Sequence, residues 1–229
     1  EKETVNKNVL CSFVDLDPER TIGLFAAAQW EVKFYDRFAE ALNDFCQRYD
    51  LSVIALGGKS DWEISQSVLD KIQVRSFNAC GKTNLRESAA LIQRCSLVVG
   101  VDSSPAHMAC AVGTPNVVVM GGGHFGRFMP YSNLTTMVCQ PLDCYGCNWK
   151  CKFASAHCIK EIDPQVIEAA LETTLTSSSS KARVFAQKSP GNSLLKLEST
   201  DITKVLDLNK VTIIDVELKE TATTPQELR

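Results

Sequence analysis

The stretch VVGVDSSPAHMACAVGTP, residues 98–115, contains the pattern that decides the fold. An apolar run over residues 96–101 predicts a buried parallel strand, because both faces of such a strand must be covered. The three residues that follow, 102–104, are of types that favour the N-cap of a helix, and Pro105 suits its first turn. The sequence therefore predicts a strand that passes through a tight turn into a helix.

This helix is short. Gly113 stands where a C-terminal cap is expected, Pro115 cannot continue a helix, and residues 116–120 predict the next strand. In a strand, helix, strand unit the free N–H groups of the helix face the carboxyl edge of the sheet. That edge is the usual place for an anionic ligand such as a phosphate.

Polar side chains surround this predicted helix start. Ser103 and Ser104 lie in the turn, and His107 lies on the first helical turn, where its ring can donate a hydrogen bond to a phosphate oxygen. The negative charge of Asp102 would repel a phosphate, but its carboxylate could accept hydrogen bonds from sugar hydroxyls. The alternative is an ordinary helix that Asp102 caps, with His107 packed or solvated.

Strands and helices alternate along most of the chain. Strands are expected at residues 21–28, 51–56, 74–79, 96–101, 116–120 and 135–139, and helices at 34–49, 62–72, 85–94, 105–112 and 165–175. This alternation predicts an α/β fold, a Rossmann-like doubly wound parallel sheet with right-handed crossovers. We expect three parts: a connector from a preceding domain at 1–20, the Rossmann-like domain at 21–175, and a linker and tail of unknown structure at 176–229, with one strand-like run at 211–216.

Composition excludes several classes of protein. The 229 residues are 45% apolar, which is enough for a substantial core, and the net charge of −3 with a pI near 5.7 argues against a nucleic-acid surface. No run approaches the roughly 18 apolar residues of a transmembrane segment, and the first residues lack the order of a signal peptide. We therefore expect a cytoplasmic location, which includes the inner face of the membrane.

Two blocks of the sequence resemble glycosyltransferase family 9, the lipopolysaccharide heptosyltransferases. The family pattern is close to D-[ST]-G-x-x-H-[LM]-A-A-A-x-G-x-P, although Ser104 replaces the usual Gly and Cys110 replaces an Ala. A second block, residues 81–100, resembles the G-K-x-S-L-x-E segment of the family. The resemblance covers about residues 21–171 and is to the C-terminal half of the two-domain GT-B fold. The residues that match the first pattern are Asp102, Ser103, His107, Met108, Ala109, Ala111, Gly113 and Pro115.

The resemblance also implies roles for residues in other loops. Gln29 and Lys33 stand where the family contacts the diphosphate of a nucleotide sugar, and Thr83 stands where its loop passes the adenine base. Asp61 resembles the acidic residue that accepts the ribose hydroxyls, and a carboxylate can bind both hydroxyls of a diol. The alternatives are a solvated first-turn lysine at Lys33 and a helix cap at Asp61.

The chain departs from the family in two segments. The sequence GGGHFGRFMPY at 121–131 predicts either a second phosphate wall, with His124 and Arg127 as diphosphate contacts, or a mobile surface loop. Four cysteines then follow in the spacing C-x2-C-x3-C-x6-C, and they could hold a structural zinc, form disulfides or remain free thiols. These cysteines are Cys144, Cys147, Cys151 and Cys158.

The resemblance implies the function of a glycosyltransferase donor domain. The donor would be an ADP-heptose-like nucleotide sugar, transferred with inversion to a hydroxyl of a glycan or lipid-linked acceptor in lipopolysaccharide or other glycan synthesis, with no cofactor required. The general base of the family lies in the N-terminal domain, so we expect this chain alone to bind the donor weakly and transfer little. The alternative is a non-catalytic nucleotide-binding or metal-stapled interaction module.

Overall fold

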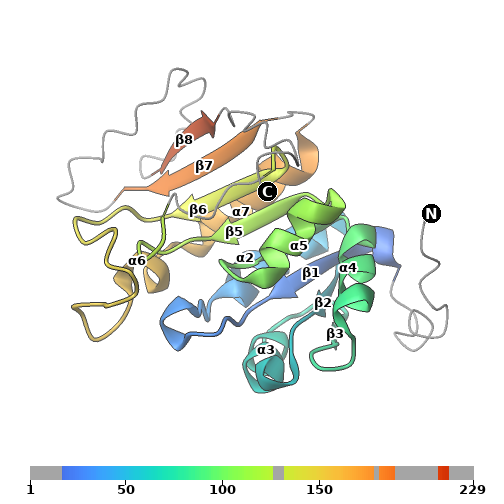
Figure 1. The fold of residues 1–229 in the computed structure, drawn as a ribbon. Helices are drawn as coiled ribbons and strands as arrows, with labels where there is room; N and C mark the ends of the chain where they lie inside the picture. The colour runs from blue at the N-terminus through green and yellow to red at the C-terminus, as the bar shows by residue number, and fades with distance from the viewer. Residues whose placement is uncertain (1–16, 126–131, 178–180, 189–210, 217–229) are drawn as a thin grey trace, which may run out of the picture.

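A computed structural model describes residues 17–125, 132–177, 181–188 and 211–216. Figure 1 shows one central sheet with helices on both faces. The sheet has eight strands in the order β3-β2-β1-β4-β5-β6-β7-β8, and all pair in parallel except β8, which pairs antiparallel with β7. The strands are β1 (Thr21–Phe25), β2 (Ser52–Ala55), β3 (Ser76–Asn78), β4 (Leu97–Val101), β5 (Asn116–Val119), β6 (Thr135–Cys139), β7 (Ala182–Gln187) and β8 (Val211–Val216).

The helices form two layers around this sheet, with α2 and α7 behind it and α4 and α5 in front in the view of Figure 1. Alternate residues of the strands face the two helix layers: Leu24 and Val99 belong to the cluster with α2 and α7, whereas Phe25 and Val98 belong to the cluster with α4 and α5. The predicted Rossmann-like doubly wound sheet is therefore confirmed. The α-helices are α2 (Phe38–Tyr49), α3 (Trp62–Leu69), α4 (Leu85–Arg94), α5 (Ser104–Val112), α6 (His157–Lys160) and α7 (Pro164–Thr176), and the 3-10 helices are η1 (Pro18–Arg20), η2 (Glu31–Lys33) and η3 (Lys59–Asp61).

Local capping explains where the main helices begin and end. Asn84 and Glu87 form a reciprocal capping box at the start of α4, and the side chain of Asp163 accepts a hydrogen bond from Gln165 N at the start of α7. Gly113 ends α5 with a φ of 75°, the left-handed conformation that glycine adopts without steric cost. The bounds of α4, α5 and α7 agree with the prediction within one or two residues, whereas α2 begins four residues after the predicted start at residue 34 and α3 ends three residues before the predicted end at residue 72.

The sheet continues beyond residue 175. After the short segment 177–181, of which 178–180 lie outside the described residues, β7 pairs with β6 and the predicted strand-like run at 211–216 pairs with β7 as β8. The expected connector at 1–20 lies outside the described residues except for Asp17 and η1. In the described part of the chain, no helix is long and apolar enough to cross a membrane.

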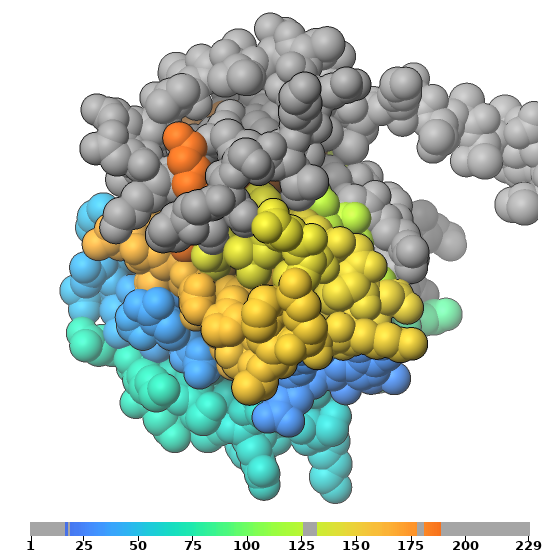
Figure 2. Space-filling view, turned by 90° about the vertical axis from the view of Figure 1, so that its left-hand side faces the viewer, coloured from blue at the N-terminus to red at the C-terminus, as the bar shows by residue number. Residues whose placement is uncertain are grey.

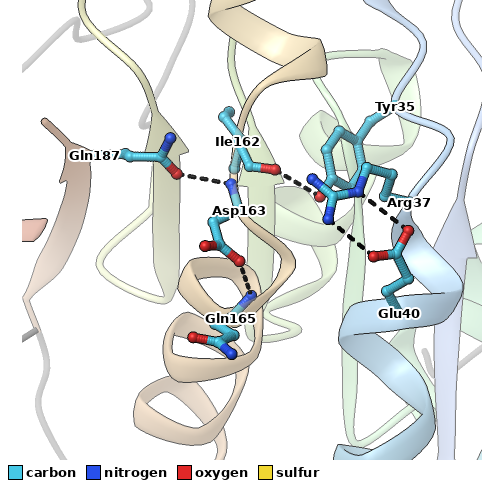
Figure 3. A network of polar contacts seen from close by, with 7 residues as sticks. All are labelled: Tyr35, Arg37, Glu40, Ile162, Asp163, Gln165 and Gln187. Carbon is cyan, nitrogen blue, oxygen red and sulfur yellow. Dashed lines mark hydrogen bonds and ion pairs between the residues drawn. The ribbon is translucent and has the colours of Figure 1, made fainter. Parts of the chain in front are cut away.

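A polar network joins the segment after β1 to the far end of the sheet (Figure 3). The buried hydroxyl of Tyr35 donates to the carbonyl of Ile162 at 2.9 Å, and burial raises the pKa of this phenol well above its usual range. The next residue, Asp163, donates its N–H to the side chain of Gln187 in β7 at 2.7 Å. This network therefore ties together three elements that are distant in sequence.

Candidate functional site

A pocket of about 300 Å³ opens at the carboxyl ends of β1 and β2, beside the N-terminus of α5. Strand β1 is the point where the strand order changes direction, because β2 pairs with one of its edges and β4 with the other. Parallel α/β sheets bind their ligands at such a switch point. The structure brings together five of the predicted ligand-binding residues around this pocket: Gln29, Asp61, Thr83, Ser103 and Ser104.

The N-terminus of α5 forms one wall of the pocket. Ser103 is the N-cap residue, but its hydroxyl donates to Val101 O at 3.1 Å and accepts no hydrogen bond from the N–H groups of the helix. The N–H groups of the first turn are therefore not covered by this side chain. An uncapped helix N-terminus attracts an anionic group through these N–H groups and through the helix dipole.

Lys33 and Asp102 pair with each other beside this helix start. The Nζ atom of Lys33 donates to both the carbonyl oxygen and Oδ2 of Asp102, each at 3.1 Å. The two side chains are only 16% and 6% exposed, and neither residue lines the pocket. The ammonium group balances the carboxylate charge, which reduces the repulsion that Asp102 would otherwise exert on a phosphate.

Asp61 closes the turn between β2 and α3 and also faces the pocket. Its Oδ2 accepts a hydrogen bond from Gly58 N at 2.8 Å, and its Oδ1 accepts one from Ser60 at 3.2 Å. As the N-cap residue of α3 it makes no side-chain cap to that helix. A Cβ atom at Gly57 would lie 2.7 Å from Oδ2, so the carboxylate position requires glycine there.

Three other residues predicted to bind the ligand, Gln29, Thr83 and His107, lie in different surroundings. Gln29 is exposed after β1, and Thr83 shares a hydrogen bond of 2.7 Å with Ser88, another residue of the pocket wall. His107 is half-buried on α5 and does not line the pocket. The roles assigned to these residues in ligand binding stay predictions.

The cysteine-rich segment packs against the glycines after β5. Gly121, Gly122 and Gly123 are buried, and a Cβ atom at Gly122 would lie 2.2 Å from the ring of Tyr145. A Cβ atom at Gly123 would lie 2.3 Å from the ring of Trp149. Gly122 and Gly123 therefore make room for aromatic rings, whereas Gly121 packs mainly against Ile159. The nearby His124 contacts Asn148 at 2.9 Å, and Arg127 lies outside the described residues.

The four cysteines of this segment lie between β6 and α7, and the last of them lies in α6. Cys144, Cys147, Cys151 and Cys158 are free thiols, and burial raises the pKa of Cys158. Among the described residues, no group of three or more His, Cys, Asp or Glu side chains could hold a metal ion. The structural zinc that the cysteine spacing suggested therefore has no support among the described residues.

Trp149 lies near the site, although no motif in the sequence indicates a role for it. The ring of Trp149 lies 4.7 Å from Nζ of Lys33, in a cation–π contact, and Trp30 meets the same ring edge-on at 6.5 Å. Figure 2 shows the edge where the parallel strands end, with the cysteine-rich segment (yellow to orange) next to the residues after β1 (blue). Trp149 follows the second of the four cysteines, and only the tertiary structure brings it to Lys33.

Comparison with known proteins places this chain in a family. A family model, Glycosyltransferase family 9 (heptosyltransferase), matches residues 5–157. Lipooligosaccharide heptosyltransferase 2 of Campylobacter jejuni is 27% identical over 161 residues, which cover 68% of this chain and 49% of that protein. A lipopolysaccharide core heptosyltransferase of Haemophilus influenzae is 32% identical over 115 residues, 49% of this chain and 32% of that protein.

Solved structures show the same fold. A family 9 glycosyltransferase from Veillonella parvula superposes with a TM-score of 0.65 at 25% identity and covers 74% of this chain and 49% of that one. The structure of E. coli ADP-heptose LPS heptosyltransferase II has a TM-score of 0.61 at 21% identity, with 76% and 52% covered. The chain thus spans about half the length of these relatives, and the expected GT-B half is confirmed as its fold. Because the family match covers more than half of the chain, the protein belongs to glycosyltransferase family 9, the heptosyltransferases.

Proposed function

We propose that this chain is the donor-binding half of a heptosyltransferase and that its pocket binds a nucleoside-diphosphate sugar. The sugar would be transferred with inversion to an acceptor hydroxyl in the synthesis of lipopolysaccharide or a related glycan. The observation that supports this most is the juxtaposition of the uncapped N-terminus of α5 with the ammonium group of Lys33, next to an open pocket. A helix N-terminus beside a cation suits the two phosphates of such a donor.

The nucleoside would lie against the apolar part of the pocket wall. The side chains of Leu56, Leu85 and Met108 belong to this wall, and apolar walls suit the face of a base. The carboxylate of Asp61 would accept the ribose hydroxyls, because each of its oxygens retains a second lone pair beside its present hydrogen bond. Adenine as the base comes from the family resemblance.

The transferred sugar would lie next to Asp102. Its carboxylate precedes the helix whose first turn would hold the phosphates, so a sugar attached to the second phosphate can reach it. The carboxylate would accept hydrogen bonds from sugar hydroxyls, and the hydrogen bond from Lys33 orients it. The acceptor and the general base would come from a preceding domain, as the family resemblance implies.

The test is a calorimetric titration of the chain with ADP and with ADP-heptose, followed by the same titrations of Asp102→Asn. We expect the wild type to bind ADP and to gain affinity from the attached heptose. Asp102→Asn should abolish most of that gain, roughly 10-fold, because a hydrogen bond to a charged group is worth about 1.5 kcal/mol or more. Parallel titrations with UDP and GDP would establish the preferred base.

The matched control is Asp36→Asn, which removes an exposed carboxylate that forms an ion pair with Lys160. This control should bind both ligands like the wild type. A wild-type chain that binds no nucleoside diphosphate at millimolar concentration would refute the proposed function. A heptose gain that survives Asp102→Asn would refute the role of Asp102 while the nucleotide site stands.

A further inference from the structure

Lys33 has a partner that its proposed role in donor binding does not explain. Its Nζ atom is held on one side by Asp102, through two hydrogen bonds of 3.1 Å. On another side it lies over the ring of Trp149, 4.7 Å from the centroid. Trp149 belongs to the cysteine-rich segment, which is far from Lys33 in the sequence, so a segment without a role in the proposed function contacts the central cation of the site.

The backbone at Trp149 adopts an unusual conformation. Asn148 and Trp149 have φ angles of 53° and 62°, in the left-handed region that residues with a Cβ atom seldom occupy. Two hydrogen bonds hold this turn on the glycine segment: Asn148 N donates to Gly123 O at 3.2 Å, and Oδ1 of Asn148 contacts the ring of His124 at 2.9 Å. Such a strained pair persists only where the surrounding contacts determine it.

The indole ring of Trp149 is fixed from several sides. It is 9% exposed and lies so close to Gly123 that a Cβ atom there would be 2.3 Å from the ring. The rings of His124 and Trp30 meet it edge-on, with centroids at 5.6 Å and 6.5 Å. The ammonium group of Lys33 lies over the face of the ring. Together these contacts hold the indole ring in one orientation.

These contacts leave Lys33 able to bind one more oxygen. A lysine ammonium has three N–H donors, and among the described residues two acceptor atoms, both of Asp102, receive hydrogen bonds from it. The aromatic face attracts the cation without accepting one of its strong hydrogen bonds. The third N–H is therefore available for a phosphate oxygen, and the long lysine side chain is already ordered before a ligand arrives.

We infer that Trp149 is a positioning residue for Lys33 and that the cysteine-rich segment is thereby part of the donor site. This inference rests on the proposed function. The ring holds the ammonium group beside the N-terminus of α5, where the diphosphate binds. The effect of Trp149 on affinity should therefore depend on Lys33 and on the phosphates of the ligand.

The experiment is a double-mutant cycle on ADP affinity, measured by calorimetry, with Trp149→Leu, Lys33→Met and the double variant. Trp149→Leu should weaken ADP binding roughly 3- to 30-fold, the range that a cation–π contact supports. In the Lys33→Met background the same substitution should change the affinity less than 2-fold. Trp149→Phe, which retains an aromatic face, should restore most of the affinity.

Two controls separate positioning from a general structural effect. Adenosine, which has no phosphate, should bind Trp149→Leu as well as it binds the wild type. Phe153→Leu removes an exposed aromatic ring of the same segment that lies near Lys152, and it should leave ADP binding unchanged. If Trp149→Leu does not fold, Trp149→Phe in both backgrounds carries the cycle, with a smaller loss that must again vanish without Lys33.

The outcomes are distinguishable. Losses that add in the double variant, or a parallel loss of adenosine affinity, would overturn the positioning role and leave the proposed function intact. A wild-type chain without affinity for ADP would overturn the proposed function and this inference with it. If Trp149→Leu loses affinity for ADP but not for adenosine, and only when Lys33 is present, the result would support both the proposed function and the positioning role.

Discussion

Gly100 is the penultimate residue of β4 and lies directly opposite Phe25 of β1, and its replacement by alanine should destabilise the fold. A Cβ atom at Gly100 would lie 2.3 Å from the carbonyl oxygen of Phe25 and 2.6 Å from its Cβ atom. Both atoms belong to or adjoin the main chain of a paired strand, so they cannot rotate away as a flexible side chain would. Relief of the clash requires β1 and β4 to move apart at the switch point.

Overpacking of a core costs about 1–3 kcal/mol, and a clash with main-chain atoms should be near the upper end of that range, about 3 kcal/mol. For a protein of this size that corresponds to a fall in Tm of roughly 6–12 °C. The free energy of unfolding is measured by urea titration with far-UV circular dichroism, and Tm by calorimetry. The strand pair also borders the pocket, which Phe25 lines, so ADP affinity should fall as well.

Gly58→Ala is the matched control. Its φ of −73° suits any residue, and its added Cβ atom would have no neighbour closer than 3.6 Å. This variant should change stability by less than about 1 kcal/mol, and a small gain is expected because alanine restricts the unfolded chain. If Gly100→Ala cost no more than Gly58→Ala, the close approach of β1 and β4 at Gly100 would be refuted.

Two further predictions concern the buried polar groups. Tyr35→Phe removes the hydrogen bond to Ile162 in the network of Figure 3 and should lower the free energy of unfolding in urea by about 1–3 kcal/mol. The control Arg37→Ala breaks a largely exposed ion pair and should lower it by less than about 1 kcal/mol. Equal losses in the two variants would contradict the burial of the Tyr35 hydroxyl. Burial raises the pKa of Cys46 from 9.0 to about 12, so the unfolded thiol ionises first and stability should fall as pH rises from about 9 toward 12. Cys46→Ala should reduce that pH slope by up to about 1.4 kcal/mol per pH unit, and an unchanged slope would show that the thiol is not buried.

Much of the fold could be predicted because its signals are local. The N-cap types before Pro105, the glycine at Gly113 and the apolar run of β4 each act within a few residues, and the structure places the helix and strands close to the predicted bounds. Parallel strands joined by helices then bring their carboxyl ends to one edge by topology alone. For that reason the pocket residues Gln29, Asp61 and Ser103 meet around one pocket, as the order of the elements implied.

The pairing of β7 and β8 with the rest of the sheet was harder to predict from the sequence. Residues 182–187 carry no strong signal of their own, and β7 forms because the edge of β6 offers a row of hydrogen-bonding groups. The sequence predicts the run at 211–216 as strand-like, but its partner depends on which edge of the sheet is exposed. Strand pairing over such distances is a property of the assembled sheet.

The sequence by itself determined the alternation of strands and helices, the position of the helix start after β4 and the family to which the chain belongs. Only the tertiary structure decided that Lys33 pairs with Asp102, 69 residues away, and that Trp149 covers the same ammonium group. Periodicity and capping act within a helix turn or a strand, so one local segment is enough to reveal them. Contacts between a lysine, a carboxylate and an aromatic ring from three loops exist only once the chain is packed, because burial and distance set their strength.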